Sequence, residues 1–461
     1  MMERIEKDTL GEVIVEEDKL WGPNTQRACN NFEFSIFPMP MEVIYALALV
    51  KKAAAAANDI LNAISHVKAN LIMKACDKIM AGEYDDQFPL FIWQSGSGTQ
   101  TNMNVNEVIA NIGHILNGGN LIDKVKYLHP NDDVNRSQST NDVFPSALYI
   151  ACTKVISEHT LPALVTLQSA LQFKADEFMP IIKTGRTHLM DATPVSLGQE
   201  FSAYASQIKH CIGYIKDALE PLSVLAIGGT ATGTGLNAPP GFDLKAVEYI
   251  NNYSGYEFKV SDNKFESLEI HDAITNASAA LNTTAMSLYK IASDIRLYAS
   301  GPRCGIGELF IPSNELGSSI MPGKINPTQC EVVTMVCAKI FGNNNTIAFA
   351  NSQGHFQLNV FKPLLGYCLI ESARLLAEAS HSFTVHCVEG IEPNLPIINR
   401  NLDNSLMLVT ALSPIIGYDN ASHIARSAFV NGTTLREEAL KSGLITPEQF
   451  DEAIEKEKKI L

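Results

Sequence analysis

Two long stretches of the chain carry apolar residues at alternating spacings of three and four positions. They are Leu197, Phe201, Tyr204, Ile208, Cys211, Ile215 and Leu219 in the first stretch, and Ile274, Ala277, Leu281, Thr284, Leu288, Ile291, Ile295 and Tyr298 in the second. This spacing is typical of a helix that packs along one seam for several heptads. Because such helices pack into bundles, we expect a mainly α fold with a central multi-helix bundle.

Length and composition indicate several domains with large buried faces. A chain of 461 residues is too long for one ordinary core. Hydrophobic residues make up 46% and charged residues 18%, an excess of apolar surface that self-association would explain. We predict a mostly helical N-terminal domain at 1–138, the central bundle at 139–395 and a small helical C-terminal domain at 396–461.

Charge and cysteine usage exclude several function classes. The net charge is -15 and the basic residues form no run, so neither a nucleic-acid partner nor an anionic membrane surface is expected. The nine cysteines show no CxxC and no zinc-type spacing, which is typical of reduced thiols in the cytosol. The sequence shows no export signal and no membrane-spanning apolar run, so we expect a cytoplasmic protein.

Polar loops interrupt the helical pattern, and chemistry is expected in such loops. The first, Ser95–Asn106, is dense in hydroxyl and amide donors that can hold a carboxylate. It lacks the Gly-Lys-Ser/Thr of a phosphate loop. A capped turn is the simpler alternative, and it stays open.

The second loop, His129–Asp142, alternates Asn and Asp like a calcium loop, but Arg136 occupies the required glycine position, so calcium is rejected. Ser139, Thr140 and Asn141 instead suggest a neutral anion-binding cluster at a helix start. Simple N-capping, which needs only one of them, is the alternative.

The third loop, Gly185–Asp191, contains His188 beside a threonine and an arginine. A histidine there can give or take a proton near neutral pH, although a lone histidine is more often structural. The glycine-rich stretch Gly228–Gly235 follows no predicted strand, so it is not interpreted as a dinucleotide-binding turn.

The fourth loop, Gly317–Glu331, combines flexible glycines with stiffening prolines, which suggests a lid that closes reproducibly. Ser318 and Ser319 offer hydroxyls and amides that could form an anion-binding nest. Lys324 and Asn326 add charge and directional hydrogen bonds. An ordinary loop that joins two helices is the alternative interpretation.

These residues resemble a known family. The motif Gly-Ser-Ser-x-Met-Pro-x-Lys-x-Asn-Pro at Gly317–Pro327 is similar to the signature of the fumarase/aspartase superfamily, and Gly323 with Thr328–Glu331 is similar to the class II, iron-independent fumarate hydratases. The stretches Gly96–Glu107, His129–Asp133, Gly185–His188 and Asn359–Pro363 also match. The resemblance implies a three-domain fold and a homotetramer whose central helices form a shared bundle, with each active site built from three subunits.

The resemblance also implies reversible hydration of fumarate to L-malate, a step of the tricarboxylic acid cycle, with no metal and no cofactor. Ser318 would take the carbon-bound proton, His188 would protonate the departing hydroxyl, Glu331 would orient His188, and Lys324 would stabilise developing charge. The small dicarboxylate substrate would be held by Ser97, Gly98, Thr99, Ser139, Thr140, Asn141, Thr187, Ser319, Lys324, Ile325 and Asn326. A second anion site would comprise Lys126, His129, Pro130, Asn131 and Asp132.

Three positions depart from the family pattern. Thr140 replaces a frequent serine, Lys126 stands where an arginine is common, and Gln357 replaces a usual glutamate. The lysine would remove bidentate anion recognition from the second site. The nearest rival activity is that of an aspartate ammonia-lyase, which Gly323 and Thr328–Glu331 argue against. A non-enzymatic scaffold is disfavoured because Ser318 and His188 are both present.

Overall fold

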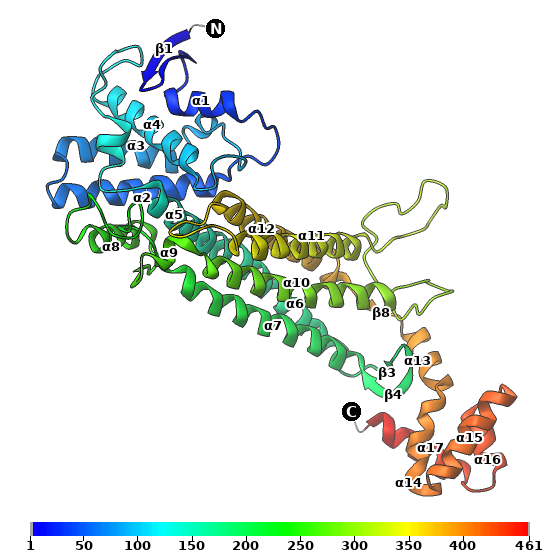
Figure 1. Cartoon of the computed structure of the whole chain (residues 1–461). Helices are drawn as coiled ribbons and strands as arrows, with labels where there is room; N and C mark the ends of the chain where they lie inside the picture. The colour runs from blue at the N-terminus through cyan, green and yellow to red at the C-terminus, as the bar shows by residue number, and fades with distance from the viewer. Residues whose placement is uncertain (1–2, 460–461) are drawn as a thin grey trace. The chain divides into compact units, whose positions relative to one another are not determined.

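The computed structural model describes residues 3–459, and its architecture is helical (Figure 1). In this part of the chain seventeen α-helices accompany eight short strands, which form sheets of two strands each. Two compact units are present: unit 1 comprises Met1–Pro162, Gly213–Ala285 and Ala338–Ala377, and unit 2 comprises Ala163–Ile212, Met286–Cys337 and Glu378–Leu461. The predicted mainly α class is confirmed.

Unit 1 contains two antiparallel strands, a set of packed helices and a short parallel strand pair. Its elements are β1 (Glu3–Asp8), β2 (Gly11–Glu16), α1 (Pro23–Asn31), α2 (Met41–Ile60), α3 (His66–Met80), η1 (Asp85–Gln87), α4 (Thr99–Leu116), η2 (Pro130–Val134), α5 (Thr140–Val155), η3 (Ile156–Thr160), β5 (Val224–Leu225), α8 (Phe242–Ser254), β6 (Lys259–Val260) and α9 (Glu266–Glu269). Helix α2 packs against α3, α5 and α8.

Five long helices have residues in both units. They are α6 (Leu161–Phe178), α7 (Leu197–Leu222), α10 (Asp272–Tyr298), α11 (Thr328–Asn351) and α12 (Lys362–His386). The predicted seam residues of α7 and α10 are buried, except Leu219 and Tyr298, which are half-buried near the helix ends. Side-chain hydrogen bonds join α7 to α10 in unit 2, as between Tyr204 and Asp294, and α10 to α11 in unit 1, as between Ser278 and Asn344.

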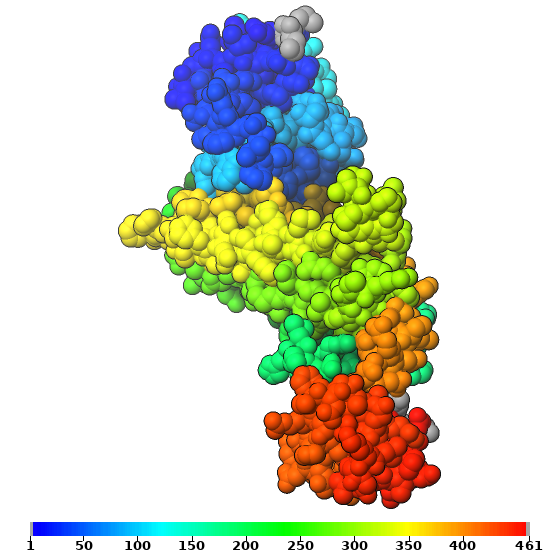
Figure 2. Space-filling model, turned by 90° about the vertical axis from the view of Figure 1, so that its right-hand side faces the viewer, coloured from blue at the N-terminus to red at the C-terminus, as the bar shows by residue number. Residues whose placement is uncertain are grey.

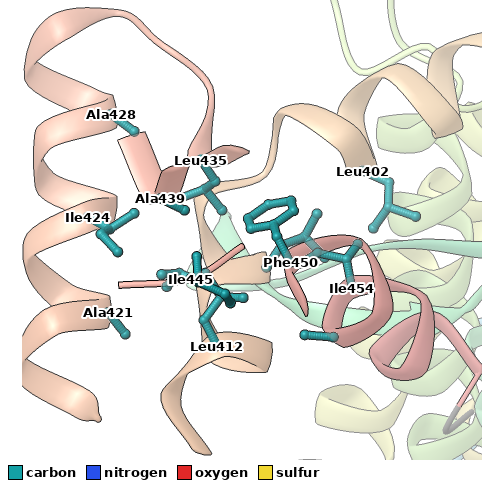
Figure 3. Close-up of a cluster of buried hydrophobic side chains, with 13 residues drawn as sticks. Leu402, Leu412, Ala421, Ile424, Ala428, Leu435, Ala439, Ile445, Phe450 and Ile454 are labelled. Atoms are coloured by element: carbon teal, nitrogen blue, oxygen red, sulfur yellow. The ribbon is translucent and has the colours of Figure 1, made fainter. Parts of the chain in front are cut away.

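The last part of unit 2 has its own apolar core (Figure 3). Its elements are β7 (Leu309–Phe310), η4 (Val388–Gly390), β8 (Glu392–Pro393), α13 (Leu395–Asn404), η5 (Leu406–Leu412), α14 (Ser413–Ile416), α15 (Tyr418–Asn431), α16 (Leu435–Lys441) and α17 (Pro447–Lys459). Leu412, Ile424, Ile445 and Phe450 point toward one another in this cluster. Helices α14 to α17 lie within the predicted helical segment 396–461, and α13 begins one residue before it, at Leu395. The three domain boundaries themselves stay predictions.

Helix α2 ends at Ile60, because Asn62 takes a left-handed backbone conformation (φ 56°) that breaks the helix. Strand β5 precedes the glycine-rich stretch Gly228–Gly235, so the expectation of no strand there was wrong; two residues are too few to show a strand period. The pair β1–β2 was not anticipated. Among residues 3–459, no helix is both long enough and apolar enough to cross a bilayer.

Candidate functional site

A polar cleft in unit 1 gathers residues from the first two polar loops. Its volume is about 830 Å³. Its lining includes the start of α4, the turn η2, the start of α5 and the loop after β5, through Thr99, Asn102, Met103, Asn131, Asp132, Asn135, Arg136, Ser137, Gln138, Ser139, Thr140, Asn141, Thr230, Ala231, Leu236 and Asn237. Four of the expected substrate-binding residues and two of the expected second anion site therefore share this cleft.

The start of α4 is shaped by two glycines. Gly98 precedes the helix at φ 82°, and a Cβ there would lie 2.5 Å from the Phe144 ring. A Cβ on Gly96 would lie 1.4 Å from the Val360 carbonyl oxygen, so only glycine fits this close approach. The turn aligns the hydroxyls of Ser97 and Thr99, whose oxygens are 2.7 Å apart.

The start of α5 is fixed by a capping box. The Ser139 amide donates to Asp142 (2.9 Å) while the Ser139 hydroxyl caps the helix. The other Asp142 oxygen accepts the amides of Gly228 and Thr230, each at 2.9 Å. Burial raises the pKa of Asp142 against the lowering effect of these bonds. N-capping is thus real at Ser139, and it holds Thr140 and Asn141 at the cleft wall.

Two asparagines that the sequence analysis did not single out complete this wall. The Asn102 amide donates to the Thr140 hydroxyl (3.0 Å) and to the Asn135 side-chain oxygen (3.3 Å). Both asparagines lie inside the polar loops identified above. In those loops the sequence prediction of substrate binding rested mainly on the hydroxyl residues and did not include these two. Nothing in the local pattern distinguishes them from capping residues.

The expected second anion site is only partly gathered. His129, Asn131 and Asp132 lie on or beside η2, and the His129 imidazole accepts the Asp132 amide at 3.1 Å. Lys126 instead donates to the backbone carbonyl of Leu121. Burial lowers the pKa of Lys126. The function of these residues as an anion site stays a prediction.

In unit 2, His188 lies at the tip of a β-hairpin. Strands β3 (Ile182–Thr187) and β4 (Met190–Ser196) pair antiparallel, and His188 and Leu189 form the two-residue turn at φ 57° and 62°. Such turns favour Asn-Gly, so two larger side chains here are strained. Thr187 and His188 are exposed. The hairpin presents the imidazole to solvent within this chain.

A buried ion-pair cluster anchors the same hairpin. The Arg186 guanidinium makes two hydrogen bonds to Glu308, at 3.0 and 2.6 Å, and the Glu308 side chain is fully buried. The Lys183 ammonium lies 3.3 Å from Glu308. Burial opposes ionisation, but the hydrogen bonds from Arg186 and the charge of Lys183 lower the pKa of Glu308. A bidentate pair of this kind fixes the hairpin in direction as well as position.

Residues 319–325 of the loop Gly317–Asn326 in unit 2 are exposed, whereas Gly317, Ser318 and Asn326 are half-buried. Figure 2 shows this yellow-green segment on the surface. The Gly317 amide bonds the Lys324 carbonyl (2.9 Å), and the Asn326 side chain donates to the Gly317 carbonyl (2.6 Å). The Ser318 hydroxyl accepts the amides of Ile320 and Met321. Two backbone amides of the loop are therefore already bonded to the Ser318 hydroxyl and are not free to bind an anion. Ser319, Lys324 and Ile325 are exposed.

The structure thus places the expected site residues in two groups, one in each unit. Glu331, in the first turn of α11, is exposed. Among residues 3–459 no hydrogen bond joins it to His188, so the expected orienting contact is not made within one described chain. No group of three histidine, cysteine or acidic side chains in this range has the arrangement of a metal site.

Comparison with known proteins identifies the family. Residues 11–342 match the family described as Lyase, and residues 408–458 match Fumarase C C-terminus. Fumarate hydratase class II of Haemophilus influenzae is 58% identical over 455 residues, which cover 98% of each chain. The chain belongs to the class II fumarate hydratase family. The corresponding protein of Pasteurella multocida is 57% identical over the same share of both chains.

The fold agrees with this family. A crystal structure of recombinant class II fumarase from Schistosoma mansoni matches with a TM-score of 0.96 and 40% identity over 99% of both chains. The predicted membership of the fumarase/aspartase superfamily is confirmed, and so is its long-helix fold. The roles of individual site residues are carried by motif position and stay predictions.

Proposed function

We propose that this protein hydrates fumarate reversibly to L-malate by acid/base chemistry of its own side chains. The similarity to fumarate hydratases over essentially the whole chain carries this proposal. The fumarase-type residues Gly323 and Thr328–Glu331 support it against the aspartate ammonia-lyase alternative. The neutral donors of the unit 1 cleft suit a small dicarboxylate.

In the dehydration direction, the Ser318 side chain starts as an alkoxide stabilised by Lys324 and nearby loop amides. It takes a proton from the carbon next to one carboxylate and becomes a hydroxyl. The electron pair moves into that carboxylate, and Lys324 and Asn326 stabilise the resulting charge. His188 protonates the departing hydroxyl, which leaves as water. Glu331 orients the imidazole. Ser97, Thr99, Ser139, Thr140, Asn141 and Thr187 hold the carboxylates in place.

The activity is tested by following the absorbance of fumarate with L-malate or L-aspartate supplied at equal enzyme concentration. We expect fumarate to form from L-malate and not from L-aspartate. Turnover of aspartate alone would replace the proposal with the ammonia-lyase. The absence of turnover with both substrates would favour the non-enzymatic scaffold.

The protein is also proposed to be a cytoplasmic homotetramer with active sites shared between subunits. Four chains of 50.3 kDa give about 200 kDa, which light scattering measures directly. Coexpression of Ser318→Ala with His188→Asn tests the sharing, because hybrid tetramers would contain some sites with both original residues. Restored turnover is expected. No restoration would show that Ser318 and His188 act from the same chain.

A further inference from the structure

Lys51 is a fully buried cation beneath the unit 1 cleft. It lies on α2 with 0% of its surface exposed. Its ammonium donates to the Asn135 side-chain oxygen at 2.7 Å, and among residues 3–459 no carboxylate lies within ion-pair distance. The next residue, Lys52, is half-buried and pairs with Asp77 at 2.6 Å. A buried charge without a counter-ion is costly, so a structural role alone does not account for Lys51.

Hydrogen bonds connect this ammonium to the cleft wall. The Asn135 side-chain oxygen that accepts the hydrogen bond from Lys51 also accepts hydrogen bonds from the side-chain amides of Asn102 (3.3 Å) and Asn106 (3.2 Å). Asn102 in turn donates to the Thr140 hydroxyl at 3.0 Å. Asn102, Asn135 and Thr140 all line the cleft. The positive charge therefore lies one side chain behind the surface that an anion would contact.

The surroundings leave this charge largely uncompensated. Burial lowers the pKa of Lys51 to about 7, against the opposing effects of Asp142 on α5 and Cys76 on α3. Asp142 already accepts three backbone amides. From α4, the amides of Asn102 and Asn106 donate to the same Asn135 oxygen that Lys51 contacts. Helix α8 faces the neighbouring Lys52 through Tyr253. An anion in the cleft would stabilise the ammonium form.

We propose that Lys51 is a positioning residue that supplies buried positive charge for the dianionic substrate, acting through Asn135 and Asn102. The inference deepens the proposed function and rests on it for the identity of the anion. Because the substrate favours the charged amine, binding above neutral pH takes up a proton. This uptake distinguishes the role of Lys51 from a packing role.

Calorimetry of the full-length protein with succinate, which has two carboxylates but no double bond, measures this uptake. Titrations at pH 8 in HEPES and in Tris differ in apparent enthalpy by the number of protons bound multiplied by the difference between the ionisation enthalpies of the two buffers. We expect roughly half a proton or more per site for the original protein, and less for Lys51→Met. No uptake in the original protein, or unchanged uptake in the variant, would overturn the inference.

Kinetics supply the second measurement. Lys51→Met should raise the KM for fumarate about tenfold and leave kcat within about threefold, because the loss of an interaction that is equally strong in the ground state and the transition state raises KM alone. Lys52→Met is the matched control and should change neither. Unchanged KM in Lys51→Met contradicts the inference while fumarate hydration stands. If Lys51→Met does not fold, the calorimetric titrations of the original protein in HEPES and in Tris still test the inference, because they measure proton uptake without the variant. Proton-linked succinate binding without fumarate turnover would refute the proposed function and retain the role of Lys51.

Discussion

The two groups of site residues are held in very different ways. In unit 1, Thr140 and Asn102 belong to a buried network in which one side chain fixes the next. In unit 2, Ser318 lies in an exposed loop and His188 at an exposed hairpin tip. The first group is preorganised to bind, whereas the second carries the proposed reactive groups on segments that need further contacts to enclose a substrate. Variants in the two groups should therefore fail in different ways.

Ser318→Ala should give the largest effect. Loss of the proposed base lowers kcat by about 10³-fold, in the range typical of general acid/base groups. Folding should change little, since the hydroxyl only accepts two amides in an exposed turn. Steady-state kinetics and the thermal midpoint measure both, with the exposed Ser313→Ala as control. Near-normal turnover would show that the reactive group lies elsewhere.

His188→Asn should lower kcat by roughly 10²-fold or more, because the imidazole is lost as a proton donor. Asparagine tolerates the left-handed backbone at φ 57°, so the hairpin should persist. The exposed His210→Asn on α7 is the matched control. Steady-state kinetics measure the loss of kcat for the two variants. A kcat like that of the original protein would exclude His188 as the acid.

The sequence predicts the structure well where the burial of each residue follows a regular apolar pattern, and poorly where it does not. The seam of α7 was predictable because its apolar spacing coincides with its burial. The role of Ser318 rests on its distinctive motif and stays a prediction. The β1–β2 hairpin was not, since Arg4 is buried there while Ile5 is 69% exposed, which reverses the expected pattern. The Arg4 guanidinium instead donates to backbone carbonyls such as that of Trp21 (2.6 Å).

Lys51 shows the same limit within the site. Its alanine-rich surroundings indicate helix propensity and nothing about the cleft. Its significance comes from Asn135, which is 84 positions away in sequence. Long-range partners of this kind leave no local period, so the sequence predicted the donors at the cleft surface and missed the charge behind them.

Thr140→Val should change binding more than chemistry. The valine keeps the shape but removes the hydroxyl that Asn102 contacts, so we expect KM to rise about tenfold, equivalent to roughly 1.4 kcal/mol. Thr153→Val on the same helix is the control, because its buried hydroxyl has no hydrogen-bond partner among the described residues. A fall in kcat with constant KM would assign Thr140 to the chemical step. The distinction between binding residues in unit 1 and proposed reactive residues in unit 2 would then be lost.

A substitution of Lys362 should give the smallest effect of the four. It tests whether the buried interior of unit 1 is stable by its own contacts, through the pH dependence of the free energy of unfolding. Its side chain is fully buried, its ammonium has no hydrogen-bond partner among residues 3–459, and burial lowers its pKa to about 7. The unfolded chain therefore binds more protons than the folded chain between pH 7 and the ordinary lysine range, so stability rises with pH there. Below pH 7 both states are charged and the full cost of burial remains.

Lys362→Met removes this titration. The stability gain of the variant over the original protein should be greatest at pH 6 and about 1 kcal/mol smaller at pH 8. Thermal or denaturant unfolding at the two pH values measures it, with the exposed Lys209→Met as control. A difference that does not change with pH would mean that the Lys362 ammonium keeps its charge throughout, which requires an anionic partner. That result would make the interior of unit 1 dependent on a bound ion or a neighbouring chain, and its preorganisation could no longer be assigned to its own hydrogen bonds.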